Sequence, residues 1–98
     1  MDIKLLEQNA ERAADLLAAM ANPRRLMVLC KLVDGEKSVT ALAESVGIGQ
    51  SALSQHLAKL RDKGLVTTRR DAQTIYYGLS SDEVKGVLST LYGLYCAA

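Results

Sequence analysis

The sequence predicts a mostly helical fold with one small β-hairpin, built as a single domain over residues 1–98. Three observations indicate this class. The chain has 98 residues, the length of one domain. Apolar residues recur at helical spacing in five segments. Residues 65–79 instead hold two runs rich in β-branched and aromatic residues, separated by a short polar break.

The first two predicted helices lie before residue 36. The first runs from about Ile3 to Met20 and is rich in alanine, the best helix former. The second begins at Asn22 and Pro23, which suit the N-cap and the first helical position, and ends at Gly35. Four residues are expected on its apolar face: Leu26, Leu29, Cys30 and Val33.

Two short amphipathic helices follow, joined by a turn of three residues. The first of them begins after the N-cap Ser38 and ends at Gly47, and the second runs from about Gln50 to Gly64. Two short helices connected by Gly47-Ile48-Gly49 are typical of a helix-turn-helix. The second helix is expected to bury three leucines: Leu53, Leu57 and Leu60.

The predicted hairpin comes directly after this motif, which is the position of a wing. Its strands are expected at residues 65–70 and 74–79, with residues 71–73 as the loop. The last predicted helix begins with Ser80-x-x-Glu83, which fits a capping box, and carries a broad apolar stripe to Tyr95.

The apolar surface of the first and last helices exceeds what so short a chain covers by itself. A homodimer through these two helices would bury it. A monomer with a tight five-helix core is the alternative.

Composition excludes several classes of protein. Hydrophobic residues make up 49% and charged residues 23%, as in globular domains. No apolar run approaches the ~18 residues of a membrane span, and the charged start at Asp2 and Lys4 does not resemble a signal peptide. We therefore expect a cytoplasmic protein with no membrane partner. No nucleophile–base pair, phosphate-binding loop or carboxylate pair indicates an enzyme, and no cofactor is expected.

Positive charge is concentrated in one part of the chain. The net charge is only +1, but residues 50–70 hold five basic side chains and one acidic one. This pattern is typical of a surface that binds a polyanion. A solvated basic face is the alternative.

The order of elements, with three short motifs, resembles the ArsR/SmtB family of bacterial winged-helix repressors. The motifs are Ala21–Leu26, Ser51–Leu57, and Arg69-Arg70 followed by Tyr76-Tyr77. The resemblance extends from about Ala14 to Cys96. It implies a dimeric transcription factor that binds a pseudo-palindromic double-stranded DNA operator and responds to a small inducer.

The helix from Gln50 is then the recognition helix, whose opening turns meet base edges. Gln pairs bidentately with adenine, and Ser bonds to any base. His56 could read a base or lie at the helix edge. Thr40 resembles a residue that contacts a phosphate. Arg69 and Arg70 begin the wing and could contact the DNA backbone or the minor groove. The candidate DNA-binding residues are Thr40, Gln50, Ser51, Ser54, Gln55, His56, Lys59, Arg69, Arg70 and Gln73. The wing tip, Asp71-Ala72-Gln73, lacks the glycine found in many relatives.

The two cysteines are the candidates for sensing. Metal-sensing relatives use a Cys-x-Cys pair in the third helix or His and acidic residues in the last one, and both patterns are absent, so no metal site is expected. Taken alone, Cys30 is a small apolar-face residue and Cys96 an incidental one near the chain end. Their sequence contexts, however, are similar to those of a dithiol subgroup that senses reactive sulfur species.

That resemblance implies a redox-sensing disulfide or polysulfide bridge between Cys30 and Cys96 that releases the operator. A regulator of the same family without thiol or metal sensing, of the virulence or nodulation type, is the alternative. A winged helix that binds another protein is a further one.

Overall fold

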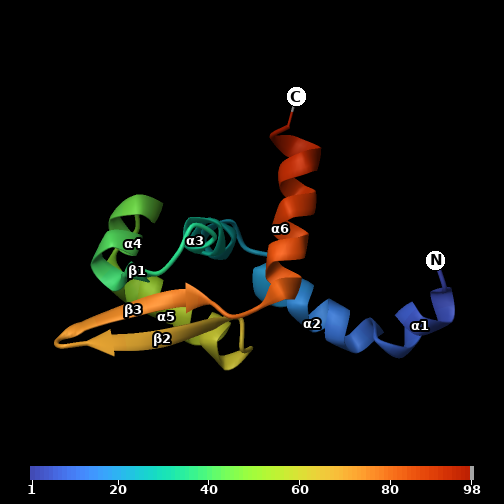
Figure 1. The fold of residues 1–98 in the computed structure, drawn as a ribbon, viewed down its shortest axis with the longest axis horizontal. Helices are drawn as coiled ribbons and strands as arrows, with labels where there is room; N and C mark the ends of the chain where they lie inside the picture. The colour runs from blue at the N-terminus through green and yellow to red at the C-terminus, as the bar shows by residue number, and fades with distance from the viewer. Residues whose placement is uncertain (98) are drawn as a thin grey trace.

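The computed structural model describes residues 1–97 and confirms the mostly helical fold with a small antiparallel sheet. Figure 1 shows α3, α4, α5 and the sheet gathered in one body, with α1 and α6 projecting from it. Within the described residues, no helix is long and apolar enough to cross a membrane.

The N-terminal segment forms two helices, so the predicted single helix from Ile3 to Met20 is wrong at its middle. Helix α1 spans Ile3–Gln8 and α2 spans Ala10–Met20. Between them, Asn9 has φ −111° and ψ 10°, and its side-chain amide donates a hydrogen bond of 2.8 Å to the Leu5 carbonyl. This side-chain bond competes with the regular backbone pattern and interrupts the helix.

The helix-turn-helix is confirmed, together with the caps that delimit it. Helix α3 spans Pro23–Leu32, and the side-chain oxygen of Asn22 accepts hydrogen bonds from the first-turn backbone. Helix α4 spans Val39–Val46 and ends at Gly47, whose φ of +79° is left-handed. Helix α5 spans Gln50–Asp62. Helices α3 and α5 end slightly before the predicted glycines.

The hairpin is also confirmed, and a short third strand joins it. Strand β2 spans Val66–Asp71 and β3 spans Thr74–Leu79, paired antiparallel around a two-residue turn. In that turn, Ala72 has φ +55°. Strand β1, Lys37–Ser38, pairs with the other side of β3 and gives the order β1-β3-β2. Strand β1 was not predicted from the sequence.

Helix α6 spans Asp82–Tyr95 and begins one residue later than the predicted capping box implies. The cap is Ser81, not Ser80, because the Ser81 hydroxyl oxygen accepts the Val84 N–H at 3.1 Å. The Ser80 hydroxyl instead donates to the Gly64 carbonyl at 2.9 Å, which fastens the start of α6 to the end of α5.

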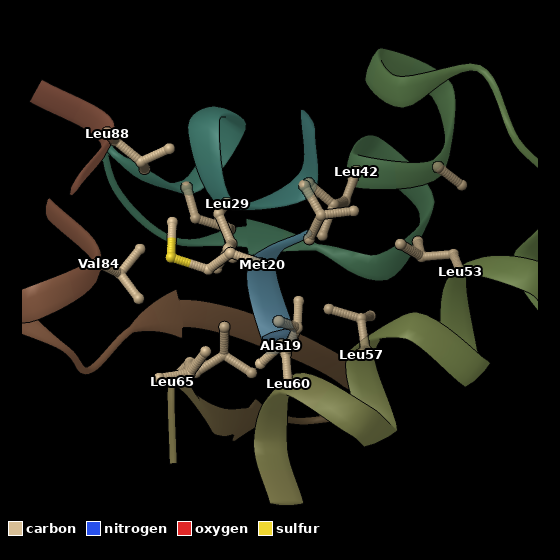
Figure 2. Packing of buried hydrophobic residues seen from close by; sticks show 14 residues of the cluster. Ala19, Met20, Leu29, Leu42, Leu53, Leu57, Leu60, Leu65, Val84 and Leu88 are labelled. Atoms are coloured by element: carbon tan, nitrogen blue, oxygen red, sulfur yellow. The ribbon is translucent and has the colours of Figure 1, made fainter. Parts of the chain in front are cut away.

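The core lies where helices α2 to α5, the sheet and the first half of α6 meet. Figure 2 shows Met20 between Leu29 and Val84, with Leu57 and Leu60 packed near Ala19. The three leucines predicted to be buried in α5 are at most 1% exposed. In contrast, Cys30 and Val33 of the predicted apolar face of α3 are exposed, because Val28, Leu29 and Leu32 occupy the core instead.

Large apolar side chains remain exposed on the elements that project from the body. They belong to α1, α2 and the second half of α6: Ile3, Leu5, Leu6, Leu17, Tyr92, Leu94 and Tyr95.

Candidate nucleic-acid interface

Helix α5 presents its polar residues to solvent because its leucines fix its orientation. Leu53, Leu57 and Leu60 face the core, so at 3.6 residues per turn Ser51 and Gln55 lie on the opposite side. Among the predicted residues of this helix, five are exposed: Gln50, Ser51, Ser54, Gln55 and Lys59. His56 is half-buried on the flank of the leucine stripe, which is the position of a residue at the helix edge.

The starts of α4 and α5 lie close together. The Gln50 side-chain amide donates to the Thr40 hydroxyl oxygen at 3.5 Å, and both residues are exposed. The structure therefore joins two of the predicted DNA-contacting residues into one polar patch.

The two wing arginines point in opposite directions, which the sequence analysis did not anticipate. Across the hairpin, Arg69 lies opposite Tyr76 and Arg70 lies opposite Ile75. Successive residues of a strand face opposite sides of a sheet. Arg70 therefore shares a face with Val66, which is buried in the core on the α5 side, and Arg69 lies on the other face.

Arg69 has intramolecular partners. Its Nε donates to both carboxylate oxygens of Glu36, at 3.0 and 3.3 Å, and its guanidinium carbon lies 4.7 Å from the centre of the Tyr76 ring. Asp71 Oδ2 is 4.0 Å from Arg69 Nη1. Arg70, in contrast, has no ion pair within residues 1–97. Gln73 is exposed in the turn.

A polar hollow of about 520 Å³ lies between α5 and the wing. Its lining includes Ser54 and Arg61 of α5 and Tyr77 of β3. Arg61 was not among the predicted site residues, although it follows Ser54 by two helical turns. The basic charge of the segment and this spacing were the signals that could have identified it.

The two cysteines are both free and exposed. Cys30 lines a second hollow of about 400 Å³, between α3 and α6, together with Val33, Lys85, Leu88 and Tyr92. Partial burial raises the pKa of the Cys30 thiol, the Cys96 thiolate raises it further, and Lys31 acts in the opposite direction.

Residues 1–97 hold no group of three or more His, Cys, Asp and Glu side chains arranged to bind a metal ion.

A helix-turn-helix with an exposed polar second helix, followed by a wing that carries the exposed Arg70, defines a DNA-binding regulator of transcription. Residues 22–68 match the model of the bacterial regulatory proteins of the arsR family. The transcriptional activator HlyU of Vibrio cholerae is 53% identical over 98 residues, which is 100% of this chain and 91% of that protein. The chain belongs to the arsR family.

Solved structures and a further relative agree with this assignment. Reduced HlyU from V. cholerae has a TM-score of 0.88 at 53% identity, over 96% of this chain and 99% of that one. The transcriptional repressor BigR from Xylella fastidiosa has a TM-score of 0.95 at 41% identity, over 100% of both chains. The nodulation protein NolR of Rhizobium meliloti is 59% identical over 88 residues, 90% of this chain and 72% of that protein. All three are similar to this chain over most of its length.

Proposed function

We propose that this protein is a homodimeric repressor that binds a pseudo-palindromic DNA operator and releases it when Cys30 and Cys96 become bridged by sulfur. The observation that carries the DNA-binding part is the exposed polar face of α5 together with Arg70 of the wing, which has no ion pair among the described residues 1–97. Gln55 and Ser51 would meet base edges, with Thr40, Lys59 and Arg70 on phosphates.

The dimer in this proposal rests on exposed apolar side chains. Leu5 and Leu6 of α1 are 58% and 50% exposed, and Leu94 of α6 is 70% exposed. Packing α1, α2 and α6 against a second copy would remove this surface from water and set the spacing of the two recognition helices. A two-fold dimer with half-sites about 34–36 Å apart requires that spacing.

The sensing part is supported by the exposure of both free thiols, by the hollow beside Cys30 and by the Cys96 thiolate, which raises the pKa of Cys30. One of the similar solved structures is reduced HlyU from V. cholerae. BigR, the structure with the TM-score of 0.95, is a repressor, which supports the direction of regulation proposed here.

The chemistry needs only a persulfide and the two thiols. The thiolate of one cysteine attacks the outer sulfur of an organic persulfide, RSSH, and becomes a protein persulfide as RS⁻ leaves. The thiolate of the other cysteine attacks the inner sulfur of this persulfide, which is the Sγ of the first cysteine. The outer sulfur leaves as HS⁻, and a disulfide remains. Further transfers from RSSH before closure lengthen the bridge to a polysulfide. The persulfide is the oxidant, and RSH and H₂S are the reduced products.

A bridge would connect α3 to the end of α6. Because α6 also carries apolar surface assigned to the dimer, the bridge would shift one recognition helix relative to the other. A coupling of about 1–3 kcal/mol corresponds to a change of about 5–150-fold in operator affinity.

The test is DNA binding by fluorescence anisotropy to the promoter fragment of the protein's own gene. Affinity is measured in reductant and after treatment with an organic persulfide, and intact mass is recorded for both samples. We expect lower affinity together with a mass that shows Cys30 bridged to Cys96.

Cys30→Ser is the control, which should bind DNA normally and remain bound after treatment. If wild-type affinity holds while both thiols react, the protein is a family regulator without thiol sensing. Release of DNA by treated Cys30→Ser would refute the bridge.

A further inference from the structure

Arg69 is held in place by groups of the protein itself. Glu36, just before β1, provides two carboxylate oxygens at 3.0 and 3.3 Å from Arg69 Nε, and the Tyr76 ring lies beneath the guanidinium. This arrangement joins both strands of the wing to a segment more than thirty positions earlier in the chain, and it lies on the face of the wing opposite Arg70.

The contact between Glu36 and Arg69 depends on a glycine in the neighbouring strand. Lys37 pairs with Tyr77, so Glu36 lies beside Gly78 of β3. A Cβ atom at position 78 would approach the Glu36 Cγ to 3.2 Å, which is tighter than nine in ten real Cβ contacts. The absence of a side chain at Gly78 lets Glu36 extend across β3 to reach Arg69 on β2.

The charges on this face do not favour DNA. Two carboxylates, Glu36 and Asp71, accompany one guanidinium, so the cluster has a net negative charge. A backbone phosphate near Arg69 would also lie near both carboxylates. Arg70, on the other face, has no such neighbours among residues 1–97.

We infer that Glu36 masks Arg69 and thereby limits the affinity of the wing for DNA. In the wild-type protein, Arg70 is the wing arginine that contacts phosphate, and Arg69 remains with Glu36. This inference rests on the proposed DNA binding but not on the cysteine switch. It differs from the expectation that both arginines contact DNA, and it assigns to Glu36 a role that the sequence did not indicate.

Neutralising Glu36 should release Arg69. The Arg69 and Glu36 side chains are 52% and 45% exposed, so a guanidinium freed from Glu36 has room to turn to a phosphate. Each added phosphate contact steepens the slope of log affinity against log salt by about 0.9. We take the contact to contribute no affinity at 1 M salt. A slope of about 0.9 over the tenfold decrease to 0.1 M salt then corresponds to roughly eightfold tighter binding per wing.

The test is a double-mutant cycle with Glu36→Gln, Arg69→Gln and the combined variant. Glu44→Gln, which removes an exposed carboxylate of α4, is the matched control for loss of one negative charge. Binding to a labelled duplex from the protein's own promoter is measured by anisotropy over a series of salt concentrations.

We expect Glu36→Gln to tighten binding and steepen the salt slope, Arg69→Gln alone to leave the slope unchanged, and the combined variant to match Arg69→Gln. Equal tightening by Glu36→Gln with and without Arg69 would overturn the inference, because it would show only a general charge effect. Weaker binding by Glu36→Gln would also overturn it. If the wild-type protein shows no salt-dependent binding, the proposed DNA binding fails, and this inference fails with it.

Discussion

Arg70→Ala is the most direct probe of the proposed DNA interface. Arg70 is exposed, lies on the face of the wing that leads to α5, and has no ion pair within residues 1–97. Its replacement should remove one phosphate contact per wing without disturbing the core, which ends at Val66 on this strand. Because phosphates carry no sequence information, binding should weaken about equally on all duplexes.

The size of the effect follows from the number of contacts. One phosphate contact contributes about 0.9 to the salt slope, and the two wings of a dimer contribute about 1.8. Between 50 and 200 mM salt, one contact loses a factor of about 3.5 in affinity, and two lose a factor of about 12. The wild-type protein should therefore lose about 12-fold more affinity over this range than Arg70→Ala does.

The assay is anisotropy titration of an operator duplex and an unrelated duplex at four or more salt concentrations. Arg69→Ala is the neighbouring control, and its slope should equal that of the wild type because Glu36 already occupies Arg69. An unchanged slope for Arg70→Ala would refute the assignment of Arg70 as a phosphate contact.

The remaining predictions concern the two thiols, one helix cap and the core. Because burial and Cys96 raise the pKa of Cys30, its alkylation followed by mass spectrometry should be slower near neutral pH than that of an unstructured cysteine. Cys96→Ser should lower the pKa of Cys30 and speed the reaction, and no acceleration would contradict the coupling. Ser81→Ala should cost about 1 kcal/mol in urea unfolding through loss of a helix cap, more than Ser80→Ala. Leu57→Ala should cost about 2–5 kcal/mol in the same assay because its side chain is 1% exposed, and a cost below 1 kcal/mol would contradict this packing.

The helix-turn-helix and the hairpin could be predicted because local signals coincide there with the packing. Asn22 and Ser38 cap helices whose apolar residues already repeat at helical spacing, and Gly47 supplies the left-handed residue that ends α4. In these segments the short-range hydrogen bonds and the buried faces favour the same structure.

Other features depend on contacts that spacing does not reveal. The alanine-rich run around Asn9 favours a continuous helix, but a single side-chain bond to Leu5 interrupts it. Strand β1 has two residues, too few for any periodicity, and forms only because β3 provides an open edge. Glu36 reaches Arg69 because Gly78, forty-two positions further along the chain, has no side chain in its path.

For the candidate site, the sequence predicted which polar side chains of α5 are exposed, but not how Cys30 and the two wing arginines are oriented. The exposed positions of α5 followed from the leucine spacing, which fixes the orientation of the helix. Cys30 was placed on the apolar face of α3, yet it is exposed because the core takes the neighbouring face. The alternation of a strand could have separated Arg69 from Arg70 in advance, because adjacent residues cannot share a face.

The turn at the tip of the wing has a consequence for how the hairpin moves. Ala72 is the non-glycine residue with positive φ among residues 1–97, and this conformation costs an alanine about 1–2 kcal/mol. The base of the hairpin, in contrast, is anchored by Val66 in the core. Opening should therefore start at the tip and proceed inward, with Arg70 among the first residues to be released. In the proposed complex, the tip of the wing could therefore adjust to the DNA surface while the base of the hairpin stays anchored in the core.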